Sequence, residues 1–232
     1  MSDDVVLLAS YPRSGNSLLR SVLKGAFGLW SSSVYVTETY SQEIAERLGH
    51  VDHADADIMT DLNDGLCLFK THEYPTSTTR AIYMVRDGRE ASVSYAKFSG
   101  TFSKQEYTLD DVIAGRCRYN SWSDHLRAWM PDLRPNTLLL RYADMRQDLG
   151  GTVEAIATFL HRDPVGGDVP AFDQMRQLSS DFFRSGTNAT WRDVMTDEQH
   201  EQFWNMHGRC MERFGYTKDA CVTAGAGEIQ YV

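Results

Sequence analysis

The sequence of 232 residues lacks the segments that would carry a protein into or through a membrane. No apolar run reaches the length needed to cross a bilayer. The first four residues, Met-Ser-Asp-Asp, have neither the positive charge nor the apolar core of a signal peptide. We therefore expect a cytoplasmic protein.

Cysteine is scarce as well, and the few thiols are scattered. The four positions are Cys67, Cys117, Cys210 and Cys221. No two of them form a CxxC pair, which argues against a metal site and against a disulfide framework. We expect buried free thiols and no bound metal.

Positive charge is in deficit, with 23 Lys and Arg against 32 Asp and Glu and a formal net charge of −9. Nucleic acids and anionic membranes both bind to basic surfaces, so the composition argues against either partner. A polyanionic ligand would have to bind where cations cluster locally.

What the sequence does contain is a regular alternation of strand-length apolar runs and helical patterns. The predicted strands are Val5–Ser10, Leu66–Phe69, Ala81–Val85 and Thr137–Tyr142. We also predict one long helix from about Leu109 to Met130 and another from Asp197 to Arg213. This alternation predicts an α/β protein of three layers with a central, mainly parallel sheet. The length fits a single domain over residues 1–232, with a loosely held tail after about residue 217.

The turn after the first predicted strand carries the groups of an anion site. Residues 11–17 are Tyr-Pro-Arg-Ser-Gly-Asn-Ser, between a strand and a helix. Such a loop directs backbone N–H groups and the positive end of the helix at one spot, and Arg13 adds a full charge. Donor side chains beside it are Ser14, Asn16 and Ser17. The loop lacks the GxxxxGK[ST] pattern of nucleotide triphosphatases.

Two later strands also end in cationic or ionisable side chains. Lys70 and His72 follow the second predicted strand, and Arg86 follows the third. Ligand groups in open α/β sheets collect at the carboxyl ends of strands. We therefore expect Lys70 and His72 to lie where Arg13 also points.

Four stretches in this order resemble the sulfotransferases that use 3′-phosphoadenosine 5′-phosphosulfate (PAPS). They are residues 11–17, Lys-Thr-His at 70–72, the stretch from Arg86 to Ser94, and Phe-Phe-Arg-Ser-Gly-Thr-Asn-Ala-Thr-Trp-Arg at 182–192. The resemblance spans nearly the whole chain and is weakest from Trp30 to Gly65 and after Tyr216. It implies the sulfotransferase fold, which is P-loop-like. It also implies PAPS as the sulfate donor and 3′-phosphoadenosine 5′-phosphate (PAP) as the product.

The resemblance further assigns roles to residues. It implies His72 as the catalytic base, with Lys70 and Arg13 stabilising charge on the leaving phosphate. The donor-binding residues that it implies are Arg13, Ser14, Gly15, Asn16 and Ser17 in the first loop, Arg86 and Ser94 at the 3′-phosphate, Tyr142 near the adenine, and Arg184, Ser185 and Gly186 in the last motif. Two positions depart from the family: Leu18 replaces a Trp that stacks on adenine in many members, and Ser185 replaces a Lys. No metal is needed in this scheme.

The activity that the resemblance implies is transfer of a sulfuryl group to a hydroxyl or nitrogen of a small-molecule acceptor. The oligomeric state stays open. One alternative is a small-molecule kinase using ATP and magnesium, but the Lys-Ser/Thr that it needs in the first loop is missing. The other is a protein that binds the nucleotide without chemistry, and the presence of both Lys70 and His72 counts against it.

The segment from Ser31 to Gly65 is strongly acidic, with eight carboxylates and one cation, Arg47. In the family, this part of the chain helps to wall the acceptor pocket. Carboxylates beside aromatic rings attract cations, so we expect an acceptor that is neutral or positively charged. The alternative is that these carboxylates lie on a solvated surface helix and loop.

Overall fold

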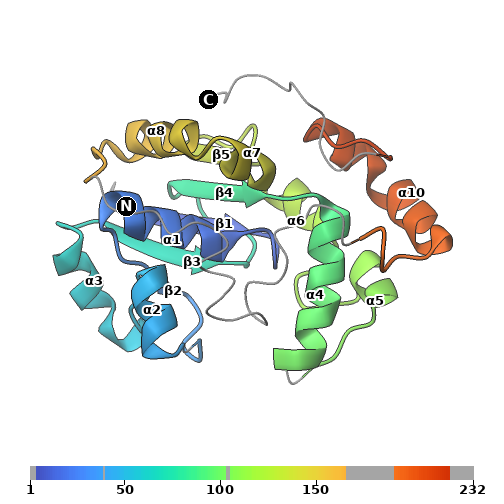
Figure 1. Ribbon diagram of the computed structural model, residues 1–232, viewed down its shortest axis with the longest axis horizontal. Helices are drawn as coiled ribbons and strands as arrows, with labels where there is room; N and C mark the ends of the chain where they lie inside the picture. Colours follow the sequence, from blue (N-terminus) through green and yellow to red (C-terminus); the bar gives the residue numbers. More distant parts are fainter. Residues whose placement is uncertain (1–3, 39, 103–104, 166–190, 220–232) are drawn as a thin grey trace.

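A parallel sheet lies at the centre of the fold (Figure 1). This computed structural model describes residues 4–38, 40–102, 105–165 and 191–219. Within them the strands are β1 (Val5–Ser10), β2 (Ser32–Ser33), β3 (Cys67–Thr71), β4 (Ala81–Val85) and β5 (Thr137–Arg141). Their order is β2-β3-β1-β4-β5, and every neighbouring pair is parallel. The predicted α/β class and parallel sheet are confirmed.

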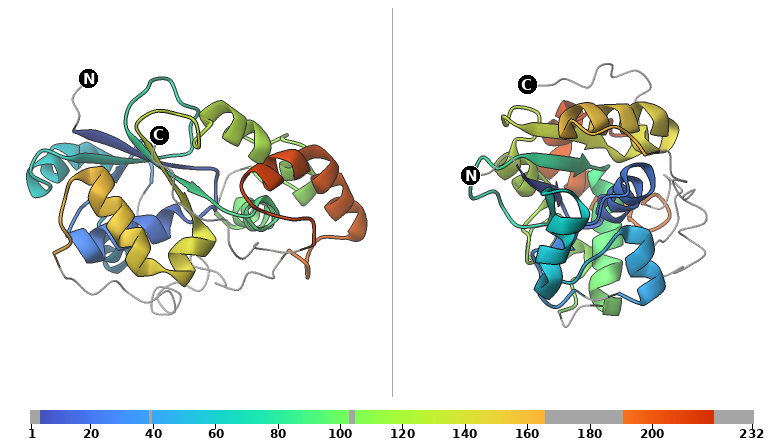
Figure 2. Two further views of the ribbon diagram at one scale, coloured as in Figure 1. Left: turned by 90° about the horizontal axis from the view of Figure 1, so that it is seen from above. Right: turned by 90° about the vertical axis from the view of Figure 1, so that its left-hand side faces the viewer.

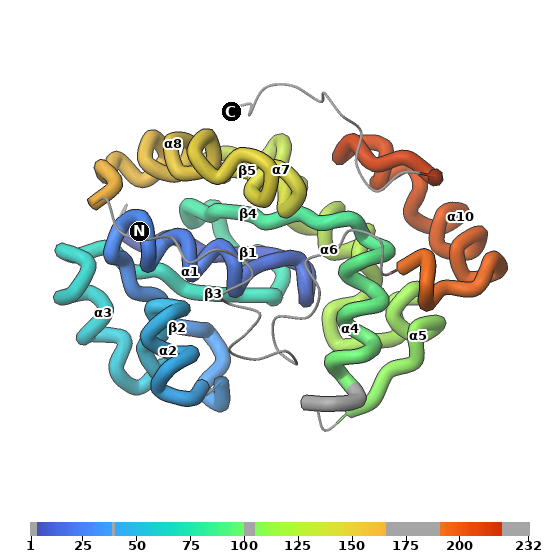
Figure 3. The backbone as a smooth tube through the Cα atoms, in the orientation of Figure 1, coloured from blue at the N-terminus to red at the C-terminus, as the bar shows by residue number. Residues whose placement is uncertain are grey.

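The register of the strands brings their carboxyl ends to one edge. β1 pairs with β3 on one side and with β4 on the other, so that Ala9 lies opposite both Thr71 and Tyr83. The loops that follow β1, β3 and β4 therefore leave the sheet side by side and face α4 (Gly88–Phe102), as Figure 3 shows. The strand order reverses at β1, and ligands of α/β sheets bind at such reversals.

Helices cover both faces of the sheet, which gives the predicted three layers (Figure 2). Besides α4, they are α1 (Asn16–Phe27), α2 (Gln42–Leu48), η1 (His53–Asp55), α3 (Ala56–Leu62), α5 (Leu109–Ile113), α6 (Trp122–Trp129), α7 (Tyr142–Gln147), α8 (Leu149–Leu160) and α10 (Asp197–Arg213). One core contains residues of α1, α2, α3, α7 and α8, and the other contains residues of α4, α5, α6 and α10. Side chains alternate along a strand, so Met84 of β4 packs in the first core and its neighbour Tyr83 in the second.

The long helix predicted from Leu109 to Met130 is wrong, because a turn separates α5 from α6. Gly115 (φ +74°) and Asn120 (φ +54°) both have left-handed backbone, which a helix cannot continue through. The Ser121 hydroxyl then accepts from the backbone N–H of Asp124, whose carboxylate accepts in return from the backbone N–H of Ser121. This capping box starts α6. The apolar pattern runs on across the turn because α5 and α6 pack in the same core.

The predictions about membrane-spanning segments and about cysteines can be compared with the fold. None of the helices in the described part of the chain is both long and apolar enough to span a membrane. Cys117 and Cys210 are buried free thiols, as predicted, whereas Cys67 is free but only half-buried. Cys221 lies outside the described residues.

The capping box at α6 gives a testable prediction for stability. Ser121→Ala should lower the free energy of unfolding by about 0.5–2 kcal/mol, because the first turn of α6 loses a hydrogen-bond acceptor. Ser121→Thr keeps the hydroxyl and serves as the matched control. Urea unfolding followed by circular dichroism measures both variants, and equal losses in the two would contradict the capping role.

Candidate active site

The loop between β1 and α1 leaves the N-terminus of the helix open. Arg13 (φ +65°) and Gly15 (φ +105°) have left-handed backbone, and the Ser14 N–H donates back to the Tyr11 carbonyl at 3.2 Å. Gly15 is the N-cap of α1 and has no side chain to cap it. The N–H groups of the first turn therefore have no intrahelical acceptor. Together with the helix dipole, such groups bind anions.

The side chains of this loop differ in what they offer a ligand. Asn16 is 5% exposed, and its amide nitrogen donates to the Leu8 carbonyl at 2.8 Å. Its side chain thus ties α1 to β1, and only its backbone N–H faces the open helix end. The Ser14 hydroxyl is buried without a hydrogen-bond partner in the described part of the chain. An unpartnered hydroxyl beside an uncapped helix fits an anionic ligand. Ser17, in the first turn, is half-buried.

Predicted donor-binding residues from three parts of the chain meet at the loop. Arg13 donates through Nε to Ser94 Oγ of α4 at 3.1 Å. Arg86, which follows β4, donates to the Arg13 carbonyl at 3.1 Å and to the Glu90 carboxylate at 3.1 Å. Glu90 is 3% exposed, and its other oxygen accepts from the backbone N–H of Trp191 at 3.2 Å. Two guanidinium groups are thereby held next to the N-terminus of α1.

Tyr142 packs against the same loop. A Cβ at Gly15 would lie 2.5 Å from Cδ2 of Tyr142, so the ring approaches the backbone as closely as only glycine allows. The Arg86 guanidinium lies 4.7 Å from the centre of the Tyr142 ring. A contact between Tyr142 and adenine stays a prediction. Leu18 is 8% exposed and belongs to the first core, so it is not placed to stack on a nucleotide.

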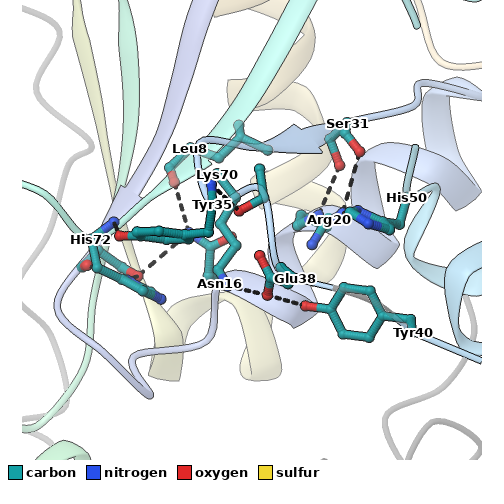
Figure 4. Close-up of polar contacts among 12 residues, drawn as sticks. Leu8, Asn16, Arg20, Ser31, Tyr35, Glu38, Tyr40, His50, Lys70 and His72 are labelled. Atoms are coloured by element: carbon teal, nitrogen blue, oxygen red, sulfur yellow. Dashed lines mark hydrogen bonds and ion pairs between the residues drawn. The ribbon is translucent and has the colours of Figure 1, made fainter. Parts of the chain in front are cut away.

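Lys70 is held by a half-buried carboxylate (Figure 4). Its ammonium forms an ion pair with Glu38, and the same Glu38 oxygen accepts from the Tyr40 hydroxyl. Burial alone would raise the pKa of Glu38, but the Lys70 ammonium and the hydrogen bonds outweigh it and lower this pKa to about 2. Burial lowers the pKa of Lys70, and Glu38 opposes that shift. The pair is a half-buried salt bridge at the carboxyl end of β3.

His72 follows β3 and is fixed in one tautomer. Its Nδ1 lies 2.7 Å from the Ser10 carbonyl, which can only accept, so Nδ1 carries the proton and Nε2 keeps its lone pair. The backbone N–H of His72 donates to the Tyr35 hydroxyl at 2.8 Å. Burial, and after it the Lys70 ammonium, lower the pKa of His72 to about 3. A neutral imidazole with a free Nε2 is the form that a general base requires.

A buried histidine, His125, contacts the backbone of His72. Nε2 of His125 donates to the His72 carbonyl at 3.0 Å, and Nδ1 of His125 accepts from the Tyr83 hydroxyl at 2.7 Å. Burial lowers the pKa of His125 to about 4, so the ring is neutral near pH 7. His125 thus fixes the backbone at His72 without adding charge.

Tyrosine rings flank the His72 side chain. Tyr35 stacks on it with ring centroids 6.1 Å apart, and Tyr119 meets it edge-on at 5.7 Å. The Arg118 guanidinium lies 5.4 Å from the Tyr35 ring centre and 5.0 Å from that of Tyr119. Aromatic faces of this kind bind apolar and aromatic molecules.

The acidic segment is mostly remote from this chemistry. Its exposed carboxylates are Glu43, Glu46, Asp52, Asp55, Asp57, Asp61 and Asp64. Glu38 is the half-buried exception, and Lys70 compensates its charge. This arrangement fits the alternative of a solvated surface, and the preference for a cationic acceptor stays a prediction.

Sequence patterns and structure differ in which site residues they reveal. Arg184, Ser185 and Gly186 of the last motif lie outside the described residues. Sequence patterns missed Glu38, Glu90 and His125. Glu90 had a usable signal, because a carboxylate four residues after Arg86 is the spacing of a helical ion pair. Glu38 had none, since it is 32 residues away from Lys70 in the chain.

Comparison with known proteins gives one consistent result. The family model for the sulfotransferase domain matches residues 3–215. Mouse sulfotransferase 2B1 is 25% identical over 253 residues, which cover 91% of this chain and 73% of the relative. Human sulfotransferase 2A1 is 26% identical over 242 residues, which cover 87% of this chain and 82% of the relative.

Solved structures of sulfotransferase type share the fold. Mouse sulfotransferase SULT7A1 complexed with PAP aligns with a TM-score of 0.68 at 20% identity, over 92% of this chain and 89% of that one. Retinol dehydratase in complex with androsterone and PAP aligns with a TM-score of 0.62 at 16% identity, over 91% of this chain and 82% of that one. The predicted sulfotransferase fold is thus confirmed, in addition to the α/β class.

The two neutral histidines of the site, the half-buried His72 and the buried His125, predict acid sensitivity. The pKa values of His72 and His125, about 3 and about 4, lie below the ordinary value of 6.5, so the unfolded chain binds more protons between these limits. The free energy of unfolding should therefore fall as the pH drops from about 6.5 toward 4, by up to about 1.4 kcal/mol per pH unit for each histidine.

Urea unfolding at a series of pH values tests this dependence. His125→Gln should be less stable at pH 7 and should lose stability less steeply on acidification. His161→Gln, which removes an exposed imidazole, is the matched control. The same slope in His125→Gln and wild type would contradict a neutral buried His125.

Proposed function

The chain belongs to the sulfotransferase family, and on that premise we propose that it transfers a sulfuryl group from PAPS to a hydroxyl or nitrogen of a small-molecule acceptor. The observation that carries this proposal is the convergence of three cations and one neutral histidine at the carboxyl edge of β1, β3 and β4. They are Arg13, Lys70, Arg86 and His72. Relatives support both substrates, since the mouse structure holds PAP and retinol dehydratase holds androsterone with PAP.

The donor would bind along the loop between β1 and α1. The open N-terminus of α1, with the N–H groups from Gly15 to Leu18, suits the 5′-phosphosulfate, and Arg13 adds charge beside it. Arg86 and Ser94 are candidates for the 3′-phosphate, joined by Arg184, Ser185 and Gly186 from the last motif. Arg86 is buried next to Glu90, so the phosphate would compete with that carboxylate for the guanidinium.

The chemistry requires position and charge more than a covalent intermediate. The donor supplies the sulfuryl group: an acceptor oxygen or nitrogen forms a bond to sulfur, and the bond from sulfur to the phosphate oxygen breaks to leave PAP. His72 would take the acceptor proton on Nε2, because Nδ1 is committed to the Ser10 carbonyl. Lys70 and Arg13 would stabilise the negative charge that develops on the leaving phosphate. We expect turnover without added metal.

The acceptor would approach between the tyrosine rings beside His72. Tyr35 and Tyr119 contact the imidazole directly, so a flat or apolar alcohol, phenol or amine fits better than a sugar phosphate. Arg118 and Glu73 form an ion pair at 3.0 Å. Their charges cancel, so the surface beside the tyrosine rings has no strong net charge.

The first functional prediction concerns donor affinity. The protein should bind PAP tightly and adenosine 5′-phosphate much more weakly, because Arg86, Ser94 and Arg184 are expected at the additional phosphate. Arg86→Ala should weaken PAP binding by roughly tenfold or more, while changing adenosine 5′-phosphate little. Calorimetry with both nucleotides measures this, and equal affinities in the wild type would refute the donor assignment.

The second prediction concerns the base. His72→Ala should lower turnover by about 10²–10⁴-fold and leave PAP affinity nearly unchanged, since the imidazole acts in the proton transfer. The assay uses PAPS with a panel of phenols, alcohols and amines, in the presence of a chelator, with ATP as the donor control. Normal turnover in His72→Ala would assign the base elsewhere.

A further inference from the structure

Arg20 of α1 is a buried cation that forms no ion pair with any described carboxylate. It is 0% exposed. Its Nε donates to Ser31 Oγ at 2.8 Å and its Nη2 donates to the Ser31 carbonyl at 3.3 Å and to His50 Nδ1 at 2.7 Å. Burial and the neighbouring guanidinium lower the pKa of His50, so His50 is a neutral partner. In the described part of the chain, Nη1 has no hydrogen-bond partner and no carboxylate lies within ion-pair distance of Arg20.

One phenol, Tyr40, lies near both Arg20 and the carboxylate that holds Lys70 (Figure 4). The Tyr40 hydroxyl donates to Oε1 of Glu38, and the Arg20 guanidinium lies 5.8 Å from the centre of the Tyr40 ring. Oε2 of Glu38 is buried and has no hydrogen-bond partner among the described residues. Two cations therefore stand on either side of one carboxylate, and each side has an unused hydrogen-bonding atom.

Donor binding creates a charge imbalance in this arrangement. If the proposed function holds, Lys70 must turn its ammonium toward the phosphosulfate, and Glu38 then loses its ion pair while its Oε2 stays buried. A buried carboxylate without a cation is strongly unfavourable, and it must take up a proton or find another cation. Arg20 is the neighbouring cation whose Nη1 is still unoccupied.

We propose that Glu38 exchanges one cation for another during the reaction, holding Lys70 in the donor-free protein and pairing with Arg20 once the donor engages Lys70. This proposal rests on the proposed function and adds two positioning residues to it, neither of which needs to touch the substrates. The charged or titratable groups that face the exchange are Lys70 on β3, Arg20 on α1, Arg13 in the first loop, His50 after α2, and Tyr40 and His72.

A double-mutant cycle on PAP affinity tests the exchange. Glu38→Gln removes the competitor for Lys70 and should tighten PAP binding by about tenfold. Arg20→Gln strands Glu38 and should weaken PAP binding by about tenfold or more. In Glu38→Gln/Arg20→Gln no carboxylate is left to strand, so the double variant should bind PAP like Glu38→Gln alone. If the effects of the two single variants on PAP affinity simply add in the double variant, the proposal is overturned, because Arg20 then acts independently of Glu38.

The number of protons taken up on PAP binding gives a second test. If Arg20 only stabilised the fold, replacing it would not change this number. Calorimetry in buffers of different ionisation enthalpy measures the protons taken up when PAP binds at pH 7. Arg20→Gln should take up about one proton more than the wild type, because the stranded Glu38 becomes protonated. The double variant should not show this excess. Equal proton uptake in all variants would overturn the exchange.

Controls separate the exchange from general effects of charge and folding. Glu43→Gln makes the same charge change at an exposed residue of the segment and should leave PAP affinity unchanged; tightening equal to that of Glu38→Gln would overturn the proposal. Arg20→Lys keeps the cation and should restore most of the wild-type affinity. If Arg20→Gln does not fold, the PAP affinities of Glu38→Gln and Arg20→Lys still test the exchange. If the wild type does not prefer PAP over adenosine 5′-phosphate, the proposed function itself is refuted. If it does prefer PAP but the effects of the two single variants add in the double variant, only the exchange is refuted.

Discussion

Parallel pairing of β1 with both β3 and β4 is the constraint on which the site depends. Because the three strands run in the same direction and in register, the chain must leave the sheet at one edge after Ser10, Thr71 and Val85. Each exit delivers one kind of chemistry: a helix N-terminus with an arginine, a lysine with a histidine, and a second arginine. A sheet with one antiparallel strand among these three would send one of these groups to the opposite edge. The topology therefore explains why residues so distant in the sequence act together.

A site built for a polyanion in an acidic protein must keep its own cations compensated before the ligand arrives. Each cation of the edge already has a partner: Arg86 pairs with Glu90, Lys70 pairs with Glu38, and Arg13 donates to Ser94. These contacts hold the side chains near their working positions, which lowers the entropy cost of binding. They also set a threshold, since a weak anion cannot displace a buried carboxylate. Only a ligand with several phosphate or sulfate groups gains enough from the whole set.

Local patterns predicted four of the five strands and the first loop because their causes are local, whereas the two-residue strand β2 (Ser32–Ser33) was missed. Val5–Ser10 is an apolar run that must be buried, and Gly15 follows it at a turn that requires positive φ. The turn within the predicted helix from 109 to 130 was missed, because the apolar spacing stays in phase across it and Gly115 alone does not break a helix. Ser94 was found by resemblance, since nothing near it in sequence indicates that Arg13 would donate to it. Neither the local pattern nor the resemblance identified Glu38, because in the sequence it does not differ from the seven solvated carboxylates of the same segment.

Two causes depress the pKa of His72: burial, which is the larger, and the Lys70 ammonium beside the imidazole. Both disfavour a positive charge on the ring, so His72 is a weak base as long as Lys70 stays uncompensated by a donor. Under the proposed function, a donor that brings negative charge to Lys70 would remove the second of these causes and strengthen the base. Proton transfer would then be coupled through charge to occupancy of the donor site. Burial and the Lys70 ammonium together keep His72 unprotonated at neutral pH, and Nε2 is the ring nitrogen that would accept a proton from the proposed acceptor.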